Sequence, residues 1–190
     1  MARYGKVHKH ATRRRIIEAA GRRLKRDGID GSGVTTLMAD AGLTNGAFYA
    51  HFDSKEDLVA NTVTDQLREQ RETYSARSLE EIVRGYLSPQ HRDDTEGGCP
   101  SAALLDEIAR SSDAVKRAYT DRQLAIIDDA AARLAPDDPL SARVRTLSVF
   151  ALMVGTLQLS RALADRQLAD DVLAQGIQNA FALLGLRDRC

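Results

Sequence analysis

Residues 35–58 read TTLMADAGLTNGAFYAHFDSKEDL, and this stretch decides the fold that we expect. Two short segments with helical spacing, about 34–41 and 44–51, lie on either side of Gly42. Glycine tolerates the left-handed conformation with which a helix often ends, so the pattern predicts two short helices joined by a tight turn. This arrangement is a helix-turn-helix, in which the first helix braces the second and the second enters the major groove of DNA.

Small and hydroxyl side chains around the turn support this interpretation. Gly46 and Ala47 leave the start of the second helix free of bulk, so that its backbone can approach DNA closely. Ser32, Thr44 and Ser54 precede the two short helices and a longer apolar pattern, and each is expected to cap the helix that follows.

The composition favours an all-α protein. The chain has 190 residues, no Trp, and 43% hydrophobic residues, which is enough for a sizeable core. Helix-forming Ala, Leu, Arg and Glu are abundant, and runs of Val and Ile are scarce. Further helices are expected at about 12–27, from 55 past 67, and at 79–87, 102–110, 114–134, 140–163 and 168–184, with residues 88–101 as a long loop.

The charge is distributed unevenly along the chain. Residues 1–27 carry ten basic and two acidic side chains, hence +8, whereas the whole chain has a formal charge of zero. A basic N-terminal arm on an acidic body is typical of a segment that meets a polyanion, either nucleic acid or a membrane surface. A solvated basic helix face is the alternative. The first helix lacks the broad aromatic and leucine face that membrane-surface binding needs.

The run from Ala41 to Leu58 resembles the recognition pattern of the TetR family of bacterial transcriptional regulators. The matching positions are Ala41, Gly42, Leu43, Thr44, Gly46, Phe48, Tyr49, His51, Phe52, Ser54, Lys55, Glu56 and Leu58. The resemblance covers residues 12–58 by motif and the rest only by length and number of helices. It implies a DNA-binding domain at residues 1–57, with the helix-turn-helix at about 33–52, followed by an effector-binding and dimerisation domain at 58–190.

The resemblance also implies which residues contact double-stranded DNA. Thr44, Tyr49, His51 and Lys55 correspond to positions that contact the DNA backbone, and Asn45 and Ala47 to positions that face base edges. Thr35 can reach either, and Arg3 belongs to the basic arm. Asn45 stands where a longer basic side chain is common in the family.

Two apolar stripes near the C-terminus predict a homodimer. Each alternates large and small residues at helical spacing, as in an isologous four-helix interface. Ordinary core packing is the alternative. The interface residues that we expect are Val144, Leu147, Ala151, Gly155, Val172, Leu173, Ile177 and Phe181.

The middle of the chain is expected to bind a small-molecule effector, although no ligand motif stands out there. Tyr86, His91, Cys99 and Tyr119 are the candidate polar groups. Cys99 lies at the start of an expected helix, where a thiol can become reactive, so a thiol- or electrophile-sensing repressor is one alternative. A small packing residue is the other.

Other classes of function find less support in the sequence. No paired carboxylates, nucleophile with a base, or phosphate loop indicates an enzyme. His8 and His10 are poorly spaced for a metal site, and no cofactor is expected. The N-terminus has no apolar signal segment, the longest uncharged apolar run is too short to span a membrane, and two cysteines fit a reducing compartment, so we expect a cytoplasmic protein.

Overall fold

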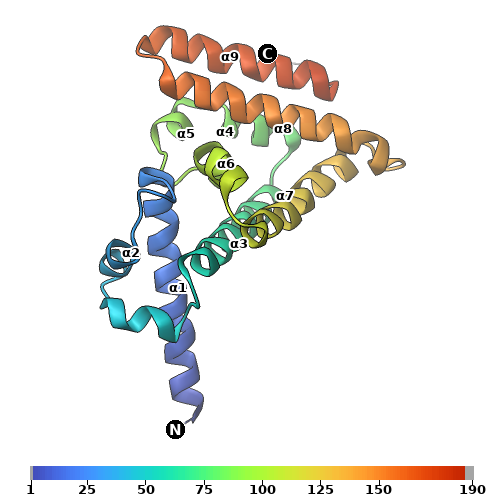
Figure 1. Ribbon diagram of the computed structural model, residues 1–190. Helices are drawn as coiled ribbons and strands as arrows, with labels where there is room; N and C mark the ends of the chain where they lie inside the picture. The colour runs from blue at the N-terminus through green and yellow to red at the C-terminus, as the bar shows by residue number, and fades with distance from the viewer. Residues whose placement is uncertain (1, 187–190) are drawn as a thin grey trace.

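The computed structural model describes residues 2–186, with side chains described from residue 7 onward (Figure 1). Its described residues form helices and connecting turns and include no strand, which confirms the all-α prediction. The elements are α1 (Ala2–Asp27), α2 (Val34–Asp40), η1 (Asn45–Ala50), α3 (Lys55–Ser75), α4 (Leu79–Tyr86), α5 (Pro89–Asp93), α6 (Pro100–Arg110), α7 (Asp113–Leu134), α8 (Pro139–Ala162) and α9 (Arg166–Leu184).

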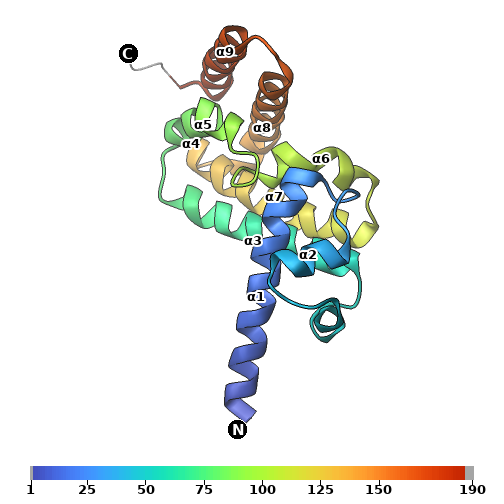
Figure 2. The ribbon, with the colours of Figure 1, turned by 90° about the vertical axis from the view of Figure 1, so that its left-hand side faces the viewer.

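The helices form an elongated molecule with its two ends made by different elements. α1 runs along one side, and its N-terminal half extends past the rest of the chain in both views (Figures 1 and 2). α8 and α9 pair at the opposite end. α3 and α7 pack closely between them and connect the small N-terminal helices to the rest.

Most helix boundaries follow local signals in the sequence. Ser54 caps α3 by accepting a hydrogen bond from the amide of Asp57, as its position predicted. Ser78 begins α4 with a reciprocal capping box to Glu81. Pro100 and the prolines that begin α5 and α8 occupy first-turn positions, where the missing amide hydrogen is not needed.

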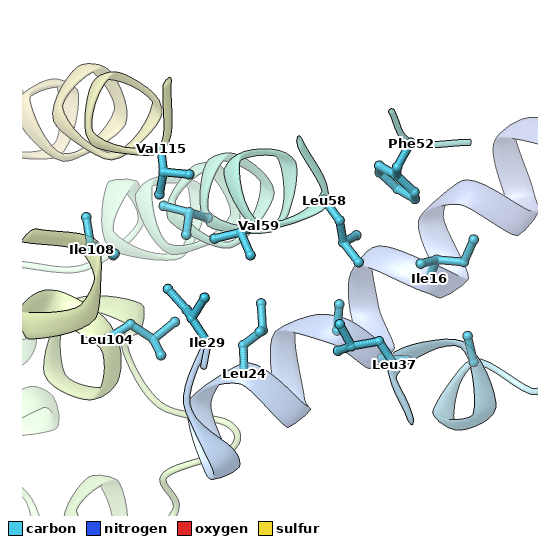
Figure 3. Close-up of a cluster of buried hydrophobic side chains, with 14 of the residues drawn as sticks. Ile16, Leu24, Ile29, Leu37, Phe52, Leu58, Val59, Leu104, Ile108 and Val115 are labelled. Carbon is cyan, nitrogen blue, oxygen red and sulfur yellow. The ribbon is translucent and has the colours of Figure 1, made fainter. Parts of the chain in front are cut away.

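One hydrophobic core joins the helix-turn-helix to the body. It contains Phe48 of η1. From Phe52, just after η1, it continues through Leu24 of α1 and Val59 of α3 to Leu104 of α6 (Figure 3). Because these buried residues form one contiguous cluster, the small helices do not have a separate core. A displacement of α1 or α6 must therefore affect the packing beneath the helix-turn-helix.

A second core lies between α4, α6, α8 and α9. Leu157 of α8 and Leu173 and Phe181 of α9 are buried there against Val83 and Leu87. By length and composition, α8 is a helix in the described part of the chain that could cross a membrane. Its Met153, Val154 and Leu157 belong to this second core, and core helices of soluble proteins pass the same test.

The structure corrects four local predictions. α1 begins at Ala2 rather than at residue 12, because no proline interrupts residues 2–27. Gly33, not Ser32, is the N-cap of α2, and the buried Ser32 hydroxyl donates to the Gly28 carbonyl at 2.7 Å.

The second recognition element is a 3₁₀ helix, since the Ala47 and His51 amides donate to carbonyls three residues earlier. The expected loop at 88–101 contains the short helix α5, whose first turn is capped by the Ser88 hydroxyl accepting from the His91 amide.

Candidate functional site

The turn between α2 and η1 has the geometry that its glycine predicted. Gly42 has φ +64°, which is unfavourable for residues with a side chain, and its amide donates to the Ala39 carbonyl at 2.9 Å. The next amide, of Leu43, donates to Met38 at 2.9 Å. These bonds end α2 and direct the chain into η1, so that the two helical elements form a helix-turn-helix.

η1 presents one face to solvent. Tyr49 is 73% exposed and its ring meets the buried Phe48 ring edge-on at 5.2 Å, so the phenol projects outward from a fixed base. Thr44, Asn45 and Gly46 are also exposed, and a Cβ placed on Gly46 would meet no atom within 4 Å. Three of the predicted contact residues, Thr44, Asn45 and Tyr49, are therefore exposed within six residues of one another, on η1 and at its N-cap.

The other predicted contact residues are placed differently. Thr35 is exposed in the first turn of α2. Ala47 is half-buried and packs against the first core, so part of its surface is used internally. Lys55 is half-buried at the start of α3 and lines a hollow of about 230 Å³ together with Glu107 and Arg110. The backbone of Arg3 belongs to α1, but its side chain lies outside the described residues.

Arg13 holds η1 in position from α1. Its guanidinium donates to the His51 carbonyl and, at 2.8 Å, to Oδ1 of Asn61 on α3. It also lies over the Phe52 ring, 4.2 Å from the centroid. Arg13 thus connects α1, the end of η1 and α3, whereas the sequence had placed it only among the charges of a basic arm.

His51 is neutral over a wider pH range than an exposed histidine. Burial lowers the pKa of its imidazole, and the positive charges of Lys9 and Arg13 lower it further. Its Nδ1 atom is buried with no hydrogen-bond partner among the described residues. A neutral imidazole can still donate one hydrogen bond, so a contact with phosphate at this position does not require a charged ring.

The basic residues of α1 divide into two groups. Those near its C-terminal end have internal partners: Arg23 pairs with Asp27 and Asp40, and Arg26 with Asp27 and Glu96. Lys25 is buried. The second group is exposed and consists of Lys9, Arg14, Arg15 and Arg22. These side chains, like the exposed face of the helix-turn-helix, are open to a polyanion.

The four candidate effector residues do not share one cavity. Tyr86 and Cys99 both line a polar chamber of about 330 Å³, whereas Tyr119 lines a separate apolar groove of about 400 Å³ between α7 and α8. The Tyr119 hydroxyl lies 3.0 Å from the Ser101 hydroxyl, and burial raises the pKa of Tyr119 to about 12. Tyr86 also lines an apolar cavity of about 60 Å³ on its other side.

His91, one of the predicted candidates, lines the same polar chamber, and so does Lys25, which was not predicted from the sequence as a site residue. The sequence signal for Lys25 was weak. Lys25 lies in a run of basic residues, although its spacing from Ile17 and Gly21 continues the inward-facing side of α1. His91 was assigned to a loop.

Cys99 is buried, and its thiol donates to Oε1 of Gln70 at 3.6 Å. No group of His, Cys, Asp and Glu side chains that could hold a metal ion is present within the described residues.

The predicted interface residues separate into two groups. Val144, Ala151 and Gly155 are exposed along α8, and Leu147 is half-buried beside them. Leu173 and Phe181 are instead buried in the core of the chain itself, and the guanidinium of Arg84 covers the Phe181 ring. Val172 and Ile177 are half-buried.

The sequence of this chain matches known regulators over part of its length. The family described as bacterial regulatory proteins, tetR family, matches residues 16–62. The transcriptional repressor AcnR of Corynebacterium efficiens is 32% identical over 83 residues, and AcnR of Corynebacterium glutamicum is 31% identical over 83 residues. Each match spans 44% of this chain and 44% of the relative, so less than half of either repressor is covered.

Solved structures of low sequence identity share the whole fold. Reduced NemR of E. coli has a TM-score of 0.70 at 17% identity, covering 90% of this chain and 95% of NemR. A TetR-family regulator from Agrobacterium tumefaciens has a TM-score of 0.72 at 19% identity, covering 90% and 98%. FadR of Bacillus subtilis, solved in complex with stearoyl-CoA, has a TM-score of 0.63 at 18% identity, covering 90% and 96%.

Proposed function

We propose that this chain, which belongs to the TetR family of transcriptional regulators, is a repressor that binds a palindromic DNA operator as a homodimer and is released by a small-molecule effector. The observation that carries the proposal is the exposed face of η1, where Thr44, Asn45, Gly46 and Tyr49 lie together on a helix-turn-helix. In this proposal residues 1–57 bind DNA, and residues 58–190 bind the effector and the second copy.

The chemistry of this face suggests how the DNA contacts are shared. Thr44 and Tyr49 offer hydroxyl groups, and the exposed basic side chains of α1 offer positive charge, which suits phosphate contacts that set affinity and position. Asn45 offers an amide that can pair with both hydrogen-bonding edges of an adenine in the major groove. We assign Thr35, His51, Lys55 and Arg3 to the backbone-contacting set, and Ala47 to the base-facing set.

Dimerisation supplies the second half-site. The exposed residues Val144, Ala151 and Gly155 give α8 an apolar face of small residues, with which the same face of a second copy can pack closely. Leu147, Val172 and Ile177 lie at its margin. Leu173 and Phe181 support this face from within the chain. Two helix-turn-helix units related by a two-fold axis would read a palindrome.

A thiol-responsive repressor is a second candidate function. The observation in its favour is that the buried Cys99 lines a chamber that also holds the Lys25 amine, so a small electrophile in the chamber would meet the thiol. Replacing Cys99 by Ser removes the reactive group. If Cys99→Ser and wild type lose DNA binding equally on treatment with N-ethylmaleimide, Cys99 is not a sensor.

We expect the protein to act in the bacterial cytoplasm, because a DNA operator would be located there. We assign it no catalytic activity and no cofactor, because the polar groups of the chamber include no nucleophile paired with a base at hydrogen-bond distance among the described residues.

Binding to the DNA upstream of its own gene tests the proposal. We expect fluorescence anisotropy to show specific binding that decreases with salt, and we expect Tyr49→Ala to weaken binding to this DNA and to random DNA alike. Asn45→Ala should instead change the preferred base pairs. Arg117→Ala on α7 is the control, because it removes an exposed side chain distant from η1 in sequence and outside the proposed DNA contacts. Equal binding of upstream and random DNA by the wild type would contradict an operator-specific function.

A further inference from the structure

Lys25 is a buried cation without a counterion. Its side chain belongs to a residue that is only 7% exposed, and its Nζ donates to the Gly98 carbonyl at 2.8 Å. Among the described residues no carboxylate forms an ion pair with it. An ammonium group has three hydrogens to donate and is costly to bury unless it is paired, so one neutral acceptor leaves most of that cost uncompensated.

The groups around Lys25 do not compensate the cost of burying its charge. Burial lowers the pKa of its amine, and this effect outweighs the opposing influence of Cys99, Asp94 and Glu69. His91, across the chamber, adds no charge. Its Nδ1 lies 2.8 Å from the Tyr86 carbonyl and its Nε2 accepts from the Cys99 amide at 3.0 Å, so the ring is the neutral tautomer protonated at Nδ1.

Lys25 lines the polar chamber of about 330 Å³, within the range of small-ligand sites. Tyr86 lines the same space and is 3% exposed, and its hydroxyl has the weakly hydrogen-bonding Cys99 thiol as a neighbour but no nitrogen or oxygen partner among the described residues. Cys99 and Pro100 also line the chamber and begin α6, which has no side-chain cap, so the positive end of that helix faces it. Arg77 adds a positive charge at the wall and Glu69 a negative one, so the buried donors rather than the net charge of the wall favour an anionic group here.

One wall of the chamber is apolar. Tyr74, Ile82 and Tyr86 line both the chamber and the apolar cavity behind it. A ligand with its anionic group at Lys25 can therefore place an apolar body against this shared wall. A fully charged ligand such as inorganic phosphate would leave the wall unused.

We propose that this chamber binds a small carboxylate with an apolar body, whose carboxylate accepts hydrogen bonds from Lys25 Nζ and from the Tyr86 hydroxyl. The carboxylate supplies the counterion that Lys25 lacks and satisfies two buried donors at once. This ligand is the effector only if the proposed repressor function holds, but its binding does not depend on DNA.

The position of Lys25 connects such a ligand to the DNA-binding helices. Lys25 and Arg26 join α1 to the segment before α6, through Gly98 and Glu96, and the Ile29 amide donates to Glu107 of α6. A carboxylate that draws Lys25 Nζ away from the Gly98 carbonyl changes this junction. α1 continues without interruption to Arg13, which holds η1.

Isothermal titration of the full-length protein without DNA tests the proposal. The probes are benzoate and hexanoate, with benzamide and hexanamide as neutral counterparts of the same shape, and phenyl phosphate and inorganic phosphate as alternative anions. We expect one or both carboxylates to bind and their amides not to bind. Lys25→Met should weaken carboxylate binding about 10- to 100-fold, as for the loss of a hydrogen bond to a charged group.

Two further variants make the result decisive. Lys116→Met is the matched control, because it makes the same substitution at an exposed position of α7 and should bind like the wild type. Tyr86→Phe removes only the hydroxyl and should also weaken binding, which decides the question if Lys25→Met does not fold. Each of four results would overturn the assignment: the amides bind as tightly as the acids, only the phosphates bind, no probe binds, or the folded Lys25→Met and Tyr86→Phe variants bind with wild-type affinity. Failure of operator binding with carboxylate binding intact would instead refute the repressor function.

Discussion

Replacing Arg13 by Met separates structural charge from DNA-contacting charge on α1. Arg13 makes one bond to the His51 carbonyl, one to Asn61 and one stacking contact with Phe52. A hydrogen bond from a charged group contributes about 1.5–3 kcal/mol, and a partly exposed cation–π contact about 0.5–2 kcal/mol. These contributions overlap on one guanidinium, and methionine retains some packing, so we expect a loss of about 2–4 kcal/mol.

Arg15→Met is the matched control for this change. Arg15 lies two residues further along the same helix, is exposed, and has no hydrogen bond or ion pair to any residue that the structure describes. The two variants remove the same charge from α1. Arg13→Met should lower the melting temperature by about 5–15 °C, given a shift of roughly 2–4 °C per kcal/mol in a chain of this size. Arg15→Met should leave it unchanged and reduce the salt dependence of DNA binding by about one ion.

Thermal unfolding by circular dichroism measures the first effect, and hydrogen exchange locates it. The amides of residues 45–61 should exchange faster in Arg13→Met, because η1 and the start of α3 lose their connection to α1. Equal melting temperatures for the two variants, with equal losses of DNA affinity, would show that Arg13 acts as a surface charge and that the connection described above contributes nothing.

Three further predictions follow from particular positions. Gly46→Ala adds a methyl group in open space, so the free energy of unfolding should stay the same or rise by up to about 1 kcal/mol. DNA binding should weaken, because the methyl group would lie between η1 and the DNA. Unchanged DNA binding would exclude a close approach of η1 to DNA at this position. Burial lowers the pKa of His91 below its usual 6.5, so the folded state takes up this proton less readily than the unfolded state, and stability is lost as the pH falls below 6.5. His91→Asn should reduce that dependence in urea unfolding, and an identical slope would contradict it. Ala151→Glu should yield a folded monomer in sedimentation, with operator affinity about 10³-fold weaker. Phe181→Asp should instead unfold the chain, because Phe181 is 2% exposed in the core of its own chain. A tight Ala151→Glu dimer would rule out this face of α8 as the interface.

Features set by neighbouring residues were predictable from the sequence. The start of α3 depends on Ser54 and an amide three residues later, and the buried residues Leu58, Val63 and Leu67 repeat at helical spacing, so the pattern alone locates this helix and its inward face. The turn at Gly42 similarly requires a backbone conformation that glycine adopts at little cost. The same local signals at Ser88 and Pro89 begin α5, but the charged residues around them had indicated a loop.

Features set by distant partners were not predictable. Arg13 and Lys25 both appear in the sequence as members of a basic segment, but their partners are 38 and 73 residues away. Only the folded chain shows that one stacks on Phe52 and the other is buried. The stripes of α8 and α9 had a related ambiguity, since the helical repeat is the same whether an apolar face meets the chain itself or a second copy. Burial assigns Phe181 to the first case and leaves Ala151 exposed.

The two buried contacts of α1 have a joint consequence for regulation. Arg13 and Lys25 are twelve residues apart on one unbroken helix, a separation of about 18 Å at 1.5 Å per residue. A tilt of α1 by about 5° at the Lys25 end would move the Arg13 end by roughly 1.5 Å, a displacement typical of helix shifts in switching proteins. Because Arg13 holds η1 through His51 and Phe52, η1 must follow α1 or lose those contacts. If the chain acts as the proposed homodimer, its recognition elements must match one DNA turn of about 34–36 Å, and the same displacement in both copies would change their separation. We therefore expect a ligand that moves Lys25 to weaken operator binding.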